Sequence, residues 1–131
     1  QIKIDDITKT HFSKLKLKDV NDEVYSNIDK ALEIAGSVFD TEYEKQLVNY
    51  GGDTYFYPIS HMKLCTDDYT EITQGMMNKG IACCFGEGRY YIEINRPFTG
   101  NECFGYDVMR VVADTISDFL GQKFYAFAIP D

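Results

Sequence analysis

The sequence lacks several features that mark whole classes of protein. Only three prolines occur among 131 residues, and 44% of the residues are hydrophobic, so a disordered chain is not expected. Lysine and arginine number 13 against 21 aspartates and glutamates, which gives a net charge of −8. A simple electrostatic nucleic-acid binder needs a surplus of cations, so we expect no nucleic-acid partner. No apolar run approaches the ~20 residues that span a bilayer, and we expect no membrane partner either.

Catalytic and metal-binding motifs are also missing. The sequence contains no G-x-S-x-G, no H-E-x-x-H and no Walker-type Gly-Lys-Ser/Thr motif. His11 and His61 do not complete a zinc pattern with the cysteines, whose spacings match no C-x-x-C motif. We therefore predict no enzyme, no metal and no cofactor. Reduced and mostly buried thiols of a cytoplasmic protein are expected for the four cysteines, Cys65, Cys83, Cys84 and Cys103.

The first half of the chain predicts helices followed by a strand. Apolar residues at helical spacing indicate a helix that begins at Asn21 or Asp22 and is ended by Gly36. A T-x-x-E capping box at Thr41 begins a second helix, which the Gly51-Gly52 pair ends. The other expected elements are an aromatic strand over residues 54–59, a short helix or loop at 67–71, and short edge strands or an arm at 2–4 and 15–18.

The second half predicts a hairpin, a long helix and a final strand. Gly86 and Gly88 in a three-residue connection indicate a hairpin of residues 81–85 and 89–95. A clean amphipathic pattern predicts a helix over residues 109–120, capped by Asp107 and ended by Gly121. The remaining segments are a turn at 97–101, a possible strand at 103–106 and an inner or covered strand at 124–129. Together they predict one α+β domain over residues 1–131, with a mostly antiparallel central sheet flanked by helices.

Acidic residues gather in the expected loops, with tyrosines in or beside the same elements. Loops on a rigid scaffold are where binding residues tend to lie. Tyrosine supplies contact area, and carboxylates steer and bind arginine, so this combination suits a partner rich in lysine and arginine. The alternative is that the acids are only solvated and the tyrosines only pack. The candidate partner-binding residues are Asp53, Asp67, Asp68, Tyr69, Glu71 and Glu87.

Three stretches resemble the SUKH superfamily of immunity proteins and yeast cell-wall regulators. Residues 28–52 look like the two opening helices of that family, and Tyr55–Ile59 is similar to the strand that follows. Residues 112–120 resemble the closing helix, whereas Asp40 and Gly51 depart from the usual proline and asparagine. The resemblance implies a non-enzymatic α+β domain that, in bacteria, neutralises a cognate toxin by direct binding. We therefore expect a cytoplasmic immunity protein that occludes a basic, nuclease-type toxin domain.

Two other functions stay open at this point. The aromatic residues could line a pocket, which would make the chain a regulatory or small-ligand-binding module. A carboxylate pair could instead serve a hydrolase, and the candidates would be Asp67-Asp68, Glu42 with Glu44, or Asp114 with Asp118. A cleft that holds two carboxylates, one with a strongly raised pKa, would distinguish the hydrolase from the other two functions.

Overall fold

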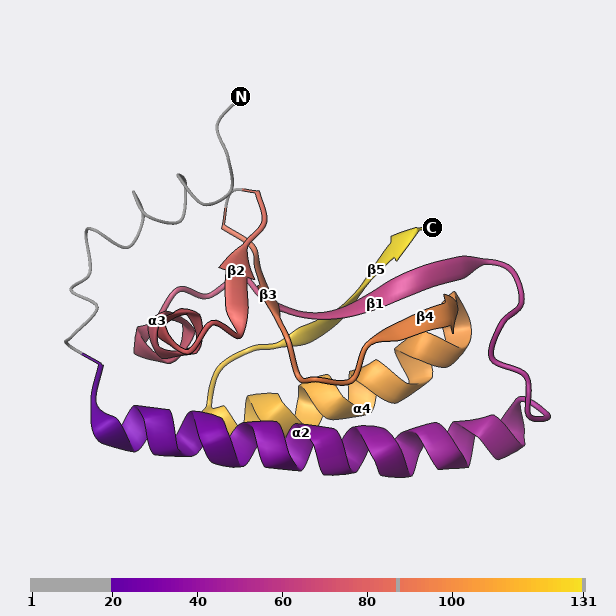
Figure 1. The fold of residues 1–131 in the computed structure, drawn as a ribbon, viewed down its shortest axis with the longest axis horizontal. Helices are drawn as coiled ribbons and strands as arrows, with labels where there is room; N and C mark the ends of the chain where they lie inside the picture. The colour runs from indigo at the N-terminus through magenta and orange to yellow at the C-terminus, as the bar shows by residue number, and fades with distance from the viewer. Residues whose placement is uncertain (1–19, 87, 131) are drawn as a thin grey trace.

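The computed structural model describes residues 20–86 and 88–130, and within these ranges three helices and five strands form the predicted α+β fold. The two long helices, α2 and α4, lie along one face of the sheet (Figure 1). The segments expected at residues 2–4 and 15–18, and the candidate site residue Glu87, lie outside the described residues.

Helix α2 (Asp22–Asn49) is one helix of 28 residues, so the predicted break at Gly36 is wrong. Asn21 caps its start, where the Asn21 side chain accepts from the Glu23 amide. Gly36 is buried inside the helix because the Arg96 guanidinium packs against it. A Cβ added to Gly36 would stand 3.1 Å from Arg96 Nη2. This glycine therefore makes room for a neighbouring side chain and does not end the helix.

Strand β1 (Ile59–Thr66) is the centre of an antiparallel sheet. On one side it pairs with β3 (Tyr90–Ile92) and β4 (Phe98–Asn101), which follow one another along its length. On the other side it pairs with β5 (Tyr125–Pro130), and β2 (Ala82–Cys84) extends the sheet beyond β3. Within the described residues β5 pairs on one side only and is half-buried, so the prediction of an inner or covered strand is not confirmed there.

The predicted hairpin, formed by β2 and β3, is confirmed. The paired stretches are shorter than predicted, with register Ala82↔Ile92 and Cys84↔Tyr90. Tyr90 and Ile92 point into the core, as their alternation predicted. The stretch predicted as a short helix or a loop, residues 67–71, is a loop up to Thr70, and helix α3 (Glu71–Asn78), capped by Thr70, begins at its last residue.

Helix α4 (Glu102–Leu120) begins earlier than predicted. Its cap is Asn101, whose side chain accepts from the Phe104 amide, so the predicted cap at Asp107 and strand at 103–106 are wrong. The predicted turn at 97–101 is mostly strand β4. The strand predicted over residues 54–59 is wrong, because residues 54–58 form a loop and only Ile59 belongs to β1. Gly121 ends α4 with φ 69°, the left-handed conformation that glycine adopts at helix ends.

The core lies between the sheet and the two long helices. Residues of α2 and α4 at helical spacing meet the inner face of the sheet, where Met62 and Leu64 of β1 are buried. His61 and Lys63 alternate with them and point to the other face, which stays partly exposed. The helices therefore cover one face of the sheet, and candidate binding residues must be sought on the other face and at the two ends.

Candidate functional site

The structure divides the predicted site residues between two ends of the molecule. Glu71 lies beside the start of α2, because its Oε1 accepts from the Asn21 amide at 2.7 Å. Asp53 follows the other end of that helix (Figure 1). A helix of 28 residues is ~42 Å long, so Asp53 cannot act together with the 67–71 segment on a small contact surface.

The acidic segment, residues 67–71, makes many contacts within the protein. The Tyr125 hydroxyl donates to Asp67 Oδ1 at 2.5 Å, and Arg89 Nε lies 3.9 Å from the same oxygen. The Tyr69 ring stacks on Tyr90 with centroids 5.7 Å apart, and its hydroxyl donates to Gln74. Burial raises the pKa of Tyr69 to about 12. Tyr69 is therefore half-buried against Tyr90, whereas Asp68 is exposed.

A buried glutamine holds the acidic segment in place. Gln122 Nε2 donates to Thr66 Oγ1 at 3.1 Å, to the Asp68 carbonyl at 3.2 Å and to Thr73 Oγ1 at 2.9 Å. Its Oε1 accepts from the Thr70 hydroxyl at 2.5 Å. Every polar atom of this side chain is used, so the connection after α4 is fastened to the start of α3.

At the opposite end, residues 53–57 form what we call the aromatic loop. Tyr55 is 64% exposed, Phe56 39% and Tyr57 89%, and Val48 on the adjoining turn of α2 is 80% exposed. Exposed hydrophobic side chains that gather in one place mark interaction surfaces more often than scattered ones do. The Asp53 carboxylate accepts from the Tyr55 amide at 2.9 Å and fixes the turn that begins the loop.

The backbone of the aromatic loop is held by the start of α4. Asn101 Nδ2 donates to the carbonyls of Phe56 at 3.0 Å and Tyr57 at 3.3 Å, and the Asn101 amide donates to the Thr54 carbonyl at 2.7 Å. Gly100 permits this approach, because a Cβ there would stand 2.4 Å from the Thr54 carbonyl oxygen. The exposed aromatic side chains thus stand on a fixed backbone.

Tyr50 packs between the aromatic loop and α4. Its ring packs against Phe104 and Phe56, with centroids 5.3 and 6.1 Å away. Its hydroxyl donates to Asp107 Oδ2 at 2.5 Å, and this hydrogen bond is the main reason that the pKa of Tyr50 rises to about 12. Arg110 lies 3.2 Å from the other oxygen of Asp107. Tyr50 therefore joins the loop to α4 as a neutral hydrogen-bond donor.

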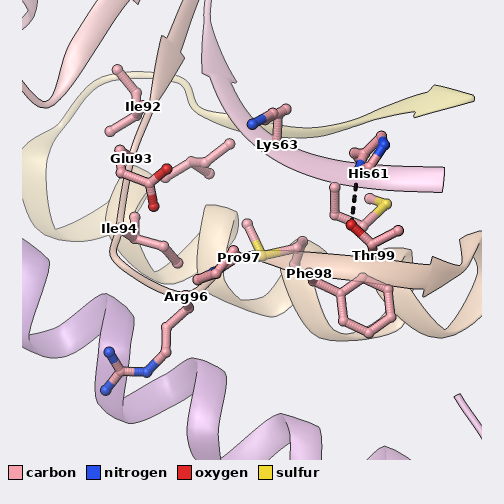
Figure 2. A pocket seen from close by; sticks show the side chains of 12 residues that line it. His61, Lys63, Ile92, Glu93, Ile94, Arg96, Pro97, Phe98 and Thr99 are labelled. Atoms are coloured by element: carbon pink, nitrogen blue, oxygen red, sulfur yellow. Dashed lines mark hydrogen bonds between the residues drawn. The ribbon is translucent and has the colours of Figure 1, made fainter. Parts of the chain in front are cut away.

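A small pocket opens in the sheet where β3 ends and β4 begins (Figure 2). Leu64 pairs with Ile92 and Met62 with Phe98, so Lys63 between them faces the gap. The pocket measures about 80 Å³, well below the ~300–1,000 Å³ of typical ligand sites. A more open groove, between α2 and the connection from β3 to β4, measures about 820 Å³ and has the size of a ligand site, so the volumes do not decide against a small-ligand function.

His61 and Arg96, two polar side chains that line the small pocket, each have a partner. His61 Nδ1 lies 2.7 Å from Thr99 Oγ1 (Figure 2). The Arg96 guanidinium points away to α2, where it makes a two-pronged contact with Asp40 at 2.8 and 3.0 Å. This contact lowers the pKa of Asp40. Among the described residues, Glu93 is the one carboxylate that lines this small pocket, whereas Glu33, Asp40 and Glu93 line the larger groove. Asp40 is paired with Arg96, and its pKa is lowered, not raised as a hydrolase acid requires. Asp114 and Asp118 stand exposed on α4.

The cysteines are of two kinds. Cys65 and Cys84 are buried, and burial raises the pKa of Cys65 to about 12, whereas Cys83 and Cys103 are exposed. The prediction of mostly buried thiols is therefore right for two of the four. Within residues 20–86 and 88–130, no three acidic, histidine or cysteine side chains are placed to bind a metal ion. In the same ranges no helix is both long enough and apolar enough to cross a membrane.

Comparison with protein-family models, curated proteins and solved structures gives no match to this chain. The resemblance to the SUKH superfamily therefore stays a prediction. The residues that hold the two candidate surfaces, Asn101, Gly100 and Gln122, were not singled out from the sequence. Asn101 before a helical pattern is a cap signal, but its contacts with residues 56 and 57 follow only from the way the chain folds.

Proposed function

We propose that this chain is an immunity protein that binds a basic toxin domain in the cytoplasm and neutralises it by occlusion, with the aromatic loop as the principal contact. The observation that carries this proposal is the set of exposed aromatic side chains on a backbone fixed by Asn101. Tyrosine is among the residues that most often dominate binding energy at protein interfaces.

The fixed backbone supports tight binding in a second way. A loop that must be ordered on binding lowers the affinity, and a loop already held in place avoids this cost. Three hydrogen bonds from Asn101 hold this one, and a fourth, from the Glu102 amide to the Pro58 carbonyl, holds the residue that follows it. The aromatic loop therefore offers contact area with little ordering left to complete.

The charge of the chain supports a basic partner. A net charge of −8 attracts a cationic domain over distances comparable to the Debye length and speeds its association. Asp53 at the start of the loop and Asp107 beneath it place carboxylates next to the aromatic side chains. A toxin that acts on RNA or DNA carries such cations on the surface that an inhibitor would have to cover.

The test is co-expression with the C-terminal domain encoded by the reading frame directly upstream. We expect the parent chain to restore growth of cells that produce this domain and to bind it directly. The double variant Tyr55→Ala/Tyr57→Ala should weaken binding about a hundredfold, equal to ~2.7 kcal/mol, and lose the rescue.

The matched control is Phe119→Ala, which removes another exposed aromatic side chain, on α4. It should leave binding unchanged, and all variants should keep thermal stability within ~0.5 kcal/mol of the parent. Rescue by the double variant would move the contact away from the aromatic loop. Absence of both rescue and binding by the parent chain would contradict the function itself.

A further inference from the structure

The larger groove, between α2 and the connection from β3 to β4, has the volume of a ligand site, about 820 Å³. The α2 residue at the middle of its lining is Gly36, and the missing side chain leaves room there for the Arg96 guanidinium. Arg96 reaches from the connection to α2, where it pairs with Asp40 (Figure 2). Asp40 is the last α2 residue along the groove, so this ion pair marks one end of it.

The groove has an apolar floor between two polar walls. Ile94 is buried, and Leu32 and Ile81 are half-buried. Glu33 on α2 and Glu93 on the connection are exposed on the two facing walls. Ligand sites are built in this way, with apolar surface for the body of a small molecule and a few polar groups that fix its orientation.

The charge of the lining is negative. Three carboxylates, of Glu33, Asp40 and Glu93, stand against the single guanidinium of Arg96. Asp40 is already neutralised, since Arg96 donates to both of its oxygens at 2.8 and 3.0 Å. Among the described residues, no lysine or arginine forms an ion pair with Glu33 or Glu93. Each wall therefore offers one carboxylate to a cationic ligand.

The wall that carries Glu93 is held in shape by its own contacts. The Glu93 amide donates to the Ile81 carbonyl at 2.7 Å, and Glu93 Oε1 accepts from the Asn95 amide at 2.8 Å. Arg96 Nη1 donates to the Asn95 carbonyl at 3.0 Å. Asn95 has φ 61°, a left-handed conformation that asparagine adopts more readily than most residues. A wall that is formed before binding loses little affinity to ordering.

We propose that the larger groove binds an aliphatic diamine or polyamine, with one ammonium group at Glu33 and another at Glu93. The methylene chain between them then covers the apolar floor. Ammonium groups donate charge-assisted hydrogen bonds to carboxylates, and each methylene that leaves water adds to the affinity. Two carboxylates on facing walls favour a ligand with two cations and repel an anionic one. The aromatic loop lies outside this groove, so the proposal is independent of the proposed toxin partner.

Titration of the full chain with hexamethylenediamine, followed by amide chemical shifts at low salt, tests the proposal. We expect saturable binding with a Kd of about 1 mM and shifts centred on the residues that line the groove. Hexylamine, which reaches only one carboxylate, should bind about fivefold more weakly, and hexanediol should not bind. Equal affinity for diol and diamine, or no saturation up to ~20 mM diamine, would overturn the proposal. Shifts centred on residues 67–71 would also overturn it, because the diamine would then follow exposed carboxylates elsewhere.

Variants separate the site from the net charge. Glu33→Gln and Glu93→Gln keep the side-chain size, and at position 93 the amide oxygen can still accept from the Asn95 amide. We expect each to weaken diamine binding about fivefold. Glu44→Gln, an exposed α2 residue outside the groove, equally changes the net charge from −8 to −7 and should alter the Kd less than about twofold. An equal loss in Glu44→Gln would contradict the site.

A steric and electrostatic block gives a second test. Ser37 is an exposed α2 residue that lines the groove, and Ser37→Lys places an ammonium group there without disfavouring the helix. We expect this variant to lose saturable diamine binding while its thermal unfolding stays that of the parent. Unchanged binding by Ser37→Lys would contradict the assignment of the ligand to this groove.

Discussion

The two ends of this molecule carry similar residues and use them differently. At the aromatic loop, the backbone makes the internal contacts and the side chains of Tyr55 and Tyr57 point to solvent. In the acidic segment, the side chains themselves are used internally, since Asp67 contacts Tyr125 and Tyr69 contacts Gln74. A side chain that already has an internal partner must give up that contact before it binds another molecule. Residue type alone therefore does not separate a contact surface from a structural segment.

The largest expected effect compares two helix caps. Asn101→Ala removes the cap of α4 and two hydrogen bonds to the aromatic loop, so we expect a loss of about 2–3 kcal/mol in the free energy of unfolding. Asn21→Ala removes only the cap of α2 and should cost about 1 kcal/mol. Denaturant unfolding measures both. Equal losses would mean that Asn101 contributes nothing to the loop beyond its role as a cap.

The next effect concerns the acidic segment. Gln122→Leu leaves the Thr70 hydroxyl and the surrounding groups without their buried partner and should cost about 2 kcal/mol. Amide exchange should become faster across residues 67–74 and stay unchanged in the aromatic loop. Gln46→Leu, on the more open surface of α2, is the control and should change stability by less than ~0.5 kcal/mol. Faster exchange at both ends would contradict their independence.

Alkaline pH should weaken both ends through tyrosine ionisation. The pKa of Tyr50 is raised by the hydrogen bond to Asp107, and that of Tyr125 first by burial and then by Asp67, each to about 12. A raised folded-state pKa means that the contribution is complete below pH 10.0, the ordinary value, and is lost as pH rises from there to about 12. Unfolding measured across this range should show a smaller decline in Tyr50→Phe and in Tyr125→Phe. An unchanged decline in either variant would contradict the assigned hydrogen bond.

The smallest expected effect compares the loss of one negative charge at each end of the molecule. Asp53→Asn and Asp68→Asn each change the net charge from −8 to −7, and Asp53→Asn keeps the side-chain acceptor for the Tyr55 amide. We expect Asp53→Asn to slow association with the toxin domain about two- to threefold at low salt, and Asp68→Asn to slow it less. Stopped-flow mixing measures both rates. A larger effect at Asp68 would favour the acidic segment as the contact.

The sequence predicted the fold class, the hairpin and the end of the last helix, because each depends on a local signal. Gly121 ends α4 by its own backbone conformation, and the alternation of Tyr90 and Ile92 marks their buried face. The predicted end of the helix at Gly36 is wrong because this glycine makes room for the guanidinium of Arg96, which lies sixty residues further along the chain. Sequence spacing alone does not reveal this contact. Without it, a glycine inside a helix has the same signal as a glycine that ends one.

The candidate site could be predicted only in part for the same reason. Tyrosines and carboxylates were found by residue type, and Asp53 with Tyr55 and Tyr57 do lie together. They are separated from Asp67 and Asp68 because α2 is one long unbroken helix. The sequence predicted two helices there, so this separation was not expected. The distinction between exposed Tyr57 and packed Tyr69 rests on long-range partners that no local pattern contains.

Hydrogen exchange of the chain alone and bound to the toxin domain from the upstream reading frame tests the central claim most directly. The account predicts that binding slows exchange across residues 48–57, the aromatic loop and the adjoining end of α2, and leaves residues 67–71 unchanged. Slower exchange at residues 67–71 together with an unaffected aromatic loop would contradict it.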